Sequence, residues 1–308
     1  MRSKIAFLFP GQGVQYVGMG RDFYDSFPVA RETFQEADDL LGEHLSKVIF
    51  QGSEELLTET LNSQLAIFIV SMALFRTVRQ QLPELVPAVC GGLSLGEYSA
   101  LCASGRLQFA EALLLVRKRA HLMSDACRMN LGSMAAVLGL DASLIETALQ
   151  SLQGVWVANY NAPGQTVISG TREGVERASI VLKERGARRV LPLAVQGAFH
   201  SPLMQSAQEG LREAIDRALF SSSSVGLVMN VPGDFVSDLT KIKENLTQQV
   251  TQSVRWEQGL QAMQRAGVDL YLEVGCGKTL TGLNRKMGLS VAASIEKVGD
   301  LEGIYAIA

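Results

Sequence analysis

The chain has 308 residues, of which 47% are hydrophobic and 19% are charged. A chain of this length and composition can bury a large core, as one large domain or as two smaller ones. The formal net charge of −3 argues against a nucleic-acid partner, so any anionic partner would have to be bound by local patches of positive charge.

The cysteines and the apolar segments indicate a compartment. The four cysteines are widely spaced and form no CxxC pair, which predicts no disulfide framework and no metal site and is typical of a reducing cytoplasm. The N-terminal apolar run Ile5–Phe9 ends at Pro10 and is too short for the apolar core of a signal peptide. The longest apolar stretch, from Leu65 to Phe75, falls short of the roughly 18 residues that a membrane span needs. We therefore expect it to be a buried core helix.

Apolar periodicity predicts strands and helices in alternation along the chain. The predicted strands are, in order, Lys4–Phe9, Val86–Cys90, Met134–Leu138, Val155–Asn159, Thr166–Gly170, Arg189–Leu193, Val225–Asn230 and, as the last, Leu270–Val274. The predicted helices are Leu65–Leu82, Glu97–Cys102, Phe109–Cys127, Ala142–Leu152 and Glu173–Arg185, with an amphipathic helix after the loop at 10–13 and further helices after residue 200.

The order of the predicted helices and strands changes near residue 133. From there the predicted order is β-α-β-β-α-β, the pattern of a ferredoxin-like unit. We therefore predict an α/β protein with a large α/β-hydrolase-like core around a parallel sheet, and a small ferredoxin-like subdomain inserted in it. The large subdomain would comprise residues 1–128 and 197–308, and the small one residues 129–196.

The segment Gly92-Leu93-Ser94-Leu95-Gly96 fits the pattern G-x-S-x-G and lies between a predicted strand and a predicted helix. In this context a sharp turn presents a serine nucleophile, with glycines where two backbones come close. The N–H groups at the start of the following helix point back at the serine, where an oxyanion would form. The alternative is a tight glycine-rich turn that contains a serine by chance.

A serine nucleophile needs a base, and the chain has three histidines. His44 lies in a polar helical stretch, and His121 lies between charged residues of a predicted helix, so we expect surface or structural roles for both. His200 follows the end of a predicted strand, on a loop of the kind where α/β enzymes place catalytic groups, and is the candidate base. A structural histidine is the alternative at this position.

Arg119 is the candidate for binding an anion. In the predicted helix Phe109–Cys127, its neighbours three and four residues away on both sides are all apolar. A buried arginine keeps its charge and must find an anion, and a ligand carboxylate could be held by two parallel hydrogen bonds. The alternatives are a guanidinium that reaches solvent and one that pairs with an internal Asp or Glu.

Two glycine-rich loops do not fit known nucleotide motifs. Gly277-Lys278-Thr279 ends like a P-loop, but Leu272 stands where the first glycine is required. Gly11-Gln12-Gly13 follows a strand like a dinucleotide fingerprint, but Tyr16 takes the place of the third glycine. The backbone N–H groups of these loops still lie beside the predicted sheet, which suits an oxyanion hole.

Taken together, these segments resemble the malonyl-CoA:acyl carrier protein transacylase family, an acyltransferase family of fatty acid and polyketide synthesis. The likeness covers nearly the whole chain. Several ordered motifs carry it, and together they are more specific than one G-x-S-x-G pattern. These motifs are Phe9–Gly13, Gly92–Tyr98, Asn159–Gln165, Gly197–Ser201, Glu273–Gly275 and Lys278 with Leu280–Leu283.

The resemblance implies a role for each matching position. Ser94 would be the acylated nucleophile and His200 its base, while Arg119 would hold the free carboxylate of the malonyl group. The backbone N–H groups of Gln12 and Leu95 would form the oxyanion hole.

Three more positions follow from the same resemblance. Gln249 lies where the family orients its histidine through a backbone carbonyl, and Asn161 lies in a matching segment and would contact the substrate. Phe199 resembles the variant that favours malonyl over the bulkier methylmalonyl units.

The chain departs from the family pattern at two positions. Leu93 stands before the serine where histidine is common, which removes a polar neighbour and is expected to change the hydration of the pocket. Cys276 stands where proline is usual, which is expected to loosen that turn. Neither departure touches a proposed catalytic atom.

The implied activity is transfer of the malonyl group from malonyl-CoA to the pantetheine thiol of acyl carrier protein, by a ping-pong cycle through a malonyl-serine. No cofactor is implied, since the carrier itself brings the pantetheine arm. We expect a cytoplasmic monomer with no nucleic-acid or membrane partner. The alternatives are a serine hydrolase or thioesterase with the same elbow, a discrete acyltransferase of a polyketide pathway, and a scaffold that only binds an acyl carrier partner.

An acidic carrier protein would need a basic docking patch. The candidate is a basic cluster at the end of the predicted small subdomain, and the alternative is an ordinary solvated face. The cluster is formed by Lys183, Arg185, Arg188 and Arg189, with Arg117, Lys118, Arg285 and Lys286 also available.

Overall fold

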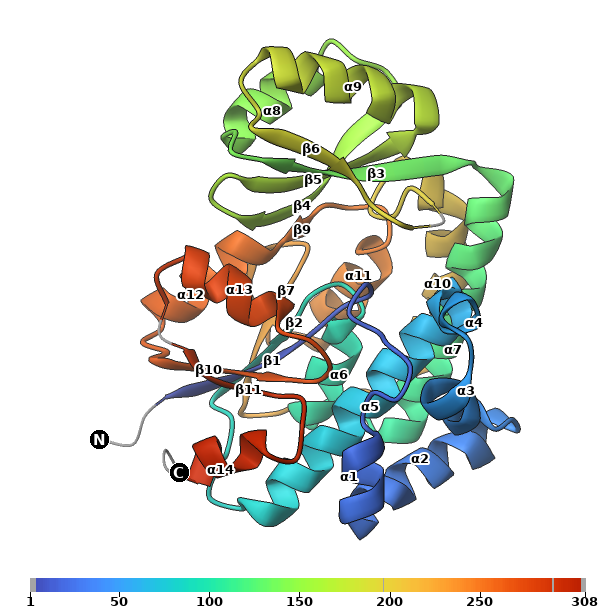
Figure 1. The fold of residues 1–308 in the computed structure, drawn as a ribbon, viewed down its shortest axis with the longest axis vertical. Helices are drawn as coiled ribbons and strands as arrows, with labels where there is room; N and C mark the ends of the chain where they lie inside the picture. The colour runs from blue at the N-terminus through green and yellow to red at the C-terminus, as the bar shows by residue number, and fades with distance from the viewer. Residues whose placement is uncertain (1–3, 196, 290, 306–308) are drawn as a thin grey trace.

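The structure is a computed structural model, and it describes residues 4–195, 197–289 and 291–305. The protein is a mixed α/β protein in which two sheets lie one above the other (Figure 1). The chain enters the upper part after helix α7 (Phe109–Met129) and leaves it after strand β6 (Arg189–Pro192).

The lower sheet has the strand order β11-β10-β1-β2-β7-β8. Neighbouring strands from β11 to β7 are parallel, and β8 pairs antiparallel with β7. The strands are β1 (Ile5–Phe9), β2 (Val89–Gly92), β7 (Gly226–Met229), β8 (Asp234–Phe235), β10 (Leu270–Val274) and β11 (Val291–Ile295).

Two sequence predictions for this sheet are wrong. Leu270–Val274 is not the last strand, because β11 follows it and pairs with it in parallel. The strand expected at Val86–Cys90 begins at Val89 instead. Val86 is 54% exposed, and the next residue is Pro87, which has no N–H to donate to a sheet.

Helices cover both faces of the lower sheet. Successive residues of β1 point to opposite faces, so Phe7 and Phe9 belong to the core with α5 and α6, while Ala6 and Leu8 belong to the core with α12 and α13. Helix α7 packs against α5 and α6, and α14 packs against β11. The helices are α1 (Arg21–Ser26), α2 (Pro28–Leu41), α3 (Leu45–Gln51), α4 (Glu54–Thr58), α5 (Thr60–Gln81), α6 (Gly96–Ala103), α7, the 3₁₀ helix η1 (Pro202–Met204), α10 (Gln205–Arg217), α11 (Leu239–Gln248), α12 (Trp256–Arg265), α13 (Thr279–Lys286) and α14 (Asp300–Tyr305).

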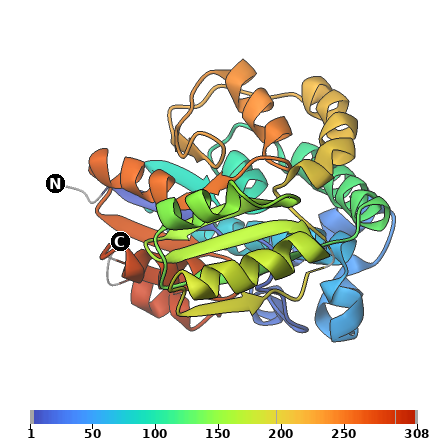
Figure 2. The same cartoon turned by 90° about the horizontal axis from the view of Figure 1, so that it is seen from above.

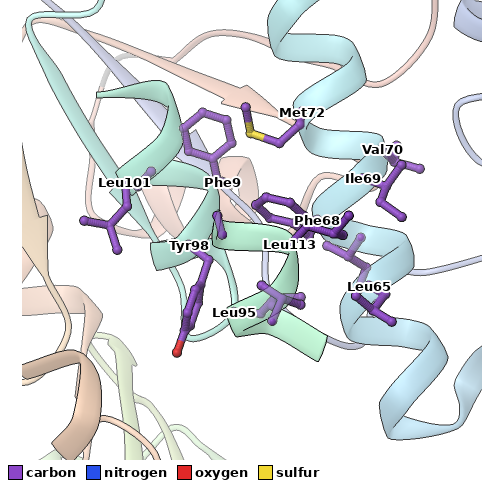
Figure 3. Close-up of a cluster of buried hydrophobic side chains, with 14 of the residues drawn as sticks. Phe9, Leu65, Phe68, Ile69, Val70, Met72, Leu95, Tyr98, Leu101 and Leu113 are labelled. Atoms are coloured by element: carbon purple, nitrogen blue, oxygen red, sulfur yellow. The ribbon is translucent and has the colours of Figure 1, made fainter. Parts of the chain in front are cut away.

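Helix α5 is the buried core helix that the sequence predicts. It contains an 18-residue window of mean hydropathy 1.4, so by length and composition it could cross a membrane, and the prediction that it is too short is wrong. Burial decides between the two, since 78% of that window lies inside the structure. Figure 3 shows Phe68 and Met72 of α5 beside Phe9, in a cluster that also contains Leu95 and Tyr98.

The upper sheet has the strand order β6-β3-β5-β4-β9, and helices α8 and α9 cover its outer face (Figures 1 and 2). The pairs β3–β5, β3–β6 and β4–β5 are antiparallel. The last strand of the sheet, β9 (Val254–Arg255), comes from the C-terminal part of the chain and pairs parallel with β4. The other elements are β3 (Gly132–Leu138), α8 (Ala142–Leu149), β4 (Val155–Ala162), β5 (Gln165–Thr171) and α9 (Arg172–Glu184).

Candidate active site

Ser94 lies in a sharp turn between β2 and α6, at the carboxyl end of the parallel sheet. Its backbone has φ 54°, a left-handed conformation that is strained for a residue with a side chain. The two glycines of the motif make the turn possible. A Cβ on Gly92 would lie 2.0 Å from the carbonyl group of Gly96, and one on Gly96 would lie 2.1 Å from the carbonyl oxygen of Phe9. The local sequence therefore allows an elbow that larger residues would block.

His200 is the partner of the Ser94 hydroxyl. Its Nε2 lies 2.8 Å from Ser94 Oγ, although 106 residues separate the two in the chain. Its Nδ1 lies 2.7 Å from the backbone carbonyl of Gln249. Because a carbonyl only accepts, Nδ1 carries the proton, and the unprotonated Nε2 is free to accept the hydroxyl proton of Ser94.

The backbone of His200, like that of Ser94, is held in a strained conformation. His200 is 4% exposed, and its backbone N–H donates to the carbonyl of Val250. With φ 57°, it is the other non-glycine residue with a left-handed backbone in the described part of the chain. Strained conformations of this kind concentrate at functional sites, where the surrounding structure holds them.

Arg119 points into the same site from α7. It is 1% exposed and donates to Ser94 Oγ at 3.1 Å, to Gln249 Oε1 at 2.9 Å and to Gln64 Oε1 at 2.6 Å. Within the described ranges it neither reaches solvent nor forms an ion pair with a carboxylate, so both alternatives for this residue are wrong. A buried cation held only by neutral acceptors is a site that an anionic ligand would complete.

Burial shifts the pKa values of the charged groups here. It lowers the pKa of Arg119, an effect partly offset by the nearby Tyr98 and by the Glu97 carboxylate. Burial and the positive charge of Arg119 lower the pKa of His200 to about 4, so its imidazole is neutral at pH 7. Burial raises the pKa of Glu97 to about 7, against the opposing effect of hydrogen bonds from Asn230 and Gln249.

A cavity of about 180 Å³ opens between the two sheets and contains these groups. Its wall combines a few polar side chains with apolar ones, as small-molecule sites commonly do. The side chain of Leu95 is buried in the core instead, so only its backbone N–H is available to the site. The cavity is lined by Gln12, Leu93, Ser94, Arg119, Met123, Met134, Asn159, Asn161, Val167, Leu193, Val195, Phe199, His200, Thr279 and Leu283.

The structure brings together the residues that the sequence singles out and leaves the other histidines apart. Gln12, Asn161 and Phe199 line the cavity beside Ser94. His121 lines a separate surface hollow, and His44 is exposed near Asp38.

Sequence reasoning missed three polar residues around Ser94. Gln64 holds Arg119, Glu97 accepts from the side chain of Gln249, and Asn230 bonds the backbone of Ser94. All three are at most 2% exposed. A polar residue next to a predicted apolar run was the available signal, but that signal does not say which partner the residue has.

The chain also matches known proteins. Residues 6–288 match the family described as Acyl transferase domain. The malonyl CoA-acyl carrier protein transacylase of Bacillus subtilis (strain 168) is 43% identical over 289 residues, which cover 92% of this chain and 90% of that protein. The chain belongs to the malonyl CoA-acyl carrier protein transacylase family. The protein of the same name from Haemophilus influenzae is 38% identical over 98% of this chain and 94% of its own length.

Solved structures agree with this assignment. The acyl-carrier-protein-S-malonyltransferase of Bartonella henselae has a TM-score of 0.94 and 38% identity, and the match covers 100% of this chain and 99% of that chain. A malonyl-transacylase solved in complex with a holo type II PKS acyl-carrier protein has a TM-score of 0.94 and 37% identity, covering 97% of this chain and 98% of its own.

Proposed function

We propose that this acyltransferase moves the malonyl group of malonyl-CoA to the pantetheine thiol of an acyl carrier protein, through a malonyl ester on Ser94. One observation carries the proposal: a buried arginine, which has no carboxylate partner among the described residues, lies 3.1 Å from a serine hydroxyl that is paired with a neutral histidine. A hydrolase of simple acyl thioesters has no need of that cation. Family membership supports the same substrate and acceptor.

In the first half of the cycle, Ser94 Oγ attacks the thioester carbonyl while His200 Nε2 takes its proton. The carbonyl of Gln249 keeps the other ring nitrogen protonated and stabilises the imidazolium that forms. His200 then gives the proton to the leaving thiolate, and free CoA departs. A malonyl-serine ester remains.

The oxyanion of each tetrahedral intermediate needs hydrogen-bond donors. In the described part of the chain, the backbone N–H groups of Gln12 and Leu95 have no acceptor, whereas the N–H of Ser94 is bonded to Asn230. We assign the oxyanion hole to Gln12 and Leu95. Losing one such donor typically costs about 3–4 kcal/mol of transition-state stabilisation.

Arg119 would bind the malonyl carboxylate with two parallel hydrogen bonds. The carboxylate carbon lies two bonds from the carbonyl carbon that Ser94 attacks, so a cation next to the nucleophile is within its reach. Fixing this end of the acyl group holds the carbonyl in one pose for both halves of the cycle.

In the second half, the pantetheine thiol of the carrier attacks the ester and His200 accepts its proton. The bond between the acyl group and Ser94 Oγ then breaks, and His200 returns the proton to Oγ, which restores the serine hydroxyl. Transfer requires that water be kept from the ester, and the small, largely apolar cavity around Ser94 favours this. Asn161, whose Oδ1 is buried without a partner among the described residues, would accept a hydrogen bond from the substrate. Phe199, which is 6% exposed, would narrow the cavity against methylmalonyl units.

The decisive experiment separates transfer from hydrolysis. The protein is incubated with malonyl-CoA and holo acyl carrier protein, and carrier-bound malonate and free malonate are measured together. Transfer predicts that most malonate is carrier-bound, and a thioesterase predicts mostly free malonate. A polyketide carrier is a second candidate acceptor because one solved relative carries such a partner, so carriers of both pathways belong in the assay.

The finer features of the protein belong to the same proposal. We assign residues 1–128 and 197–308 to an α/β-hydrolase-like core and residues 129–196 to a ferredoxin-like subdomain, an assignment supported by the β-α-β-β-α-β order of β3 to β6. The protein would act as a cytoplasmic monomer without a cofactor and without nucleic-acid or membrane partners. The basic cluster Lys183, Arg185, Arg188 and Arg189, whose members are all exposed, would dock the carrier.

A further inference from the structure

The strained backbone of Ser94 is held by a residue on the neighbouring strand. Asn230 follows β7, and its Oδ1 accepts the N–H of Ser94 over 2.6 Å while its Nδ2 donates to the carbonyl of Gly92 over 2.7 Å. A backbone N–H can only donate and a carbonyl can only accept, so the orientation of the amide is fixed. One side chain thus binds the elbow on both sides of the residue that precedes the nucleophile.

The position of Asn230 explains why an amide is needed there. Strands β2 and β7 pair as far as Gly91 and Val228, and beyond this pair the elbow turns away from the ladder. The side chain of Asn230 takes over where backbone pairing stops. Asn230 is 2% exposed, so loss of its side chain would leave buried backbone groups without partners.

We propose that Asn230 is a positioning residue for the nucleophile. It holds the elbow in its reactive conformation and determines which backbone N–H of the elbow can bind the oxyanion. Because Asn230 occupies the N–H of Ser94, the N–H of Leu95 is the one left at the elbow to face an oxyanion. Asn230 does not line the cavity, so it acts through Ser94 and not on the substrate. The inference rests on the proposed role of Ser94 as nucleophile.

Glu97 anchors this arrangement from the first turn of α6. Its Oε1 accepts the backbone N–H of Asn230 over 2.5 Å, and its Oε2 accepts from the side chain of Gln249 over 2.5 Å. The same Gln249 offers its backbone carbonyl to His200. One buried carboxylate therefore ties the support of the serine to the support of the histidine.

The test uses a reaction that needs neither malonate nor a carrier. A small fluorophosphonate forms an Oγ–P bond with the serine nucleophile and releases fluoride, and its second-order labelling rate reports how well Ser94 is positioned. For Asn230→Ala we expect this rate to fall by about 10- to 100-fold, as displacements near 1 Å can cause. The KM for malonyl-CoA should change little, because Asn230 does not contact the cavity.

Asn130→Ala is the matched control. Asn130 also donates from Nδ2 to a backbone carbonyl, that of Leu203, but it lies at the end of α7 and outside the cavity. It should lower the melting temperature and leave the labelling rate of Ser94 within twofold of the parent. Equal labelling rates in Asn230→Ala and Asn130→Ala would overturn the proposal.

A nearly isosteric variant covers the case in which Asn230→Ala does not fold. In Asn230→Asp, a charged carboxylate would turn its second oxygen toward the carbonyl of Gly92, whereas the protonated acid can donate to it as the amide does. The groups around this position that carry charge or titrate are Glu97, whose pKa is raised to about 7 by burial, Arg119 and His200. Relative to the parent, labelling of Asn230→Asp should rise as pH falls from 8 to 5.5. A constant ratio would overturn the proposal.

The two proposals fail separately. If the parent transfers malonyl and its Ser94 is labelled, but Asn230→Ala is labelled at the parent rate, the positioning role is wrong and the function stands. If the parent transfers no malonyl, but labelling of Ser94 is rapid and depends on Asn230, the function is wrong and the positioning role stands.

Discussion

Arg119 donates a hydrogen bond to the hydroxyl of Ser94 over 3.1 Å, from a guanidinium that is 1% exposed. A carboxylate bound by Arg119 would replace the hydroxyl as acceptor and free Ser94 for attack. The bonds from Arg119 to Gln64 and Gln249 would keep the guanidinium in place during that exchange. In the proposed mechanism, the group that selects the acyl substrate and the nucleophile are therefore joined by one hydrogen bond.

Replacing Arg119 should change which acyl groups are transferred. Arg119→Ala should lower kcat/KM with malonyl-CoA. The expected loss of transition-state stabilisation is about 2–5 kcal/mol, the usual cost of truncating one partner of a buried charge pair. Transfer from acetyl-CoA, which has no carboxylate, should be spared or raised. The measurement is kcat/KM for both donors with the same carrier.

The control for this change is another buried arginine. Arg106 is 2% exposed, donates to the carbonyl of Ser223 and does not line the cavity. Arg106→Ala should lower stability without changing the ratio of malonyl to acetyl transfer. Equal losses for both donors in Arg119→Ala would show that Arg119 is structural.

Ser94 should carry the acyl group during turnover. Intact-mass measurement after exposure to malonyl-CoA should find a malonyl adduct on the parent and none on Ser94→Ala. A peptide map should place the adduct between β2 and α6. An adduct that persists in Ser94→Ala would place the nucleophile elsewhere.

The pH at which labelling of Ser94 falls to half, called here the acid limit, should lie well below pH 6.5. His200 must be neutral to accept a proton, and its pKa is lowered to about 4, so labelling of Ser94 should persist through pH 5 and be halved near pH 4. Protonation of Glu97 near pH 7 leaves a lone pair on each of its oxygens, so both can still accept their hydrogen bonds. Only a small change in the labelling rate of Ser94 is therefore expected near pH 7.

Arg119 offers a check on the cause of this shift. Removing its positive charge in Arg119→Gln should raise the pKa of His200 and move the acid limit of labelling upward. A limit near pH 6.5 in the parent would contradict the lowered pKa.

The glycines of the elbow should be intolerant of a methyl group. Gly96→Ala would place Cβ 2.1 Å from the carbonyl oxygen of Phe9, and overpacking of this kind typically costs about 1–3 kcal/mol or more. Chemical denaturation gives the free energy of unfolding. Gly282→Ala is the control, because a Cβ there, on an exposed helical position, meets nothing within 4 Å and should stabilise α13 by up to about 1 kcal/mol.

The basic cluster should control the affinity for the carrier. Charge reversal of Arg188 and Arg189 to Glu should raise the KM for acyl carrier protein at low salt and leave the KM for malonyl-CoA unchanged. The salt dependence of carrier affinity should weaken in the same variant. Lys241→Glu, an exposed change on α11, is the control. An equal effect of this change on the KM for acyl carrier protein would indicate that the basic cluster is an ordinary solvated face and not the docking site.

Much of the fold could be predicted because its signals are local. Apolar runs and turns located the core strands β1, β7 and β10, and the helical pattern placed Arg119 on an apolar face before any partner was known. Strand β11 was missed although four of its five residues are apolar, because a five-residue apolar run does not show that it pairs with β10. The apolar run Leu65–Phe75 predicted the burial of α5 correctly but underestimated the apolar length of the helix.

The sequence by itself determined the elbow around Ser94, since the glycines that permit the turn are its immediate neighbours in the chain. It also determined which residues were candidates, because the motifs are contiguous. Only the tertiary structure decided that Ser94, Arg119 and His200 share one cavity, and that Asn230 and Glu97 hold the elbow. Those contacts join residues 106 and 136 positions apart. The pairing of β2 with β7 brings Asn230 to Ser94, and bonds to the backbone of Gln249 and Val250 hold His200 there.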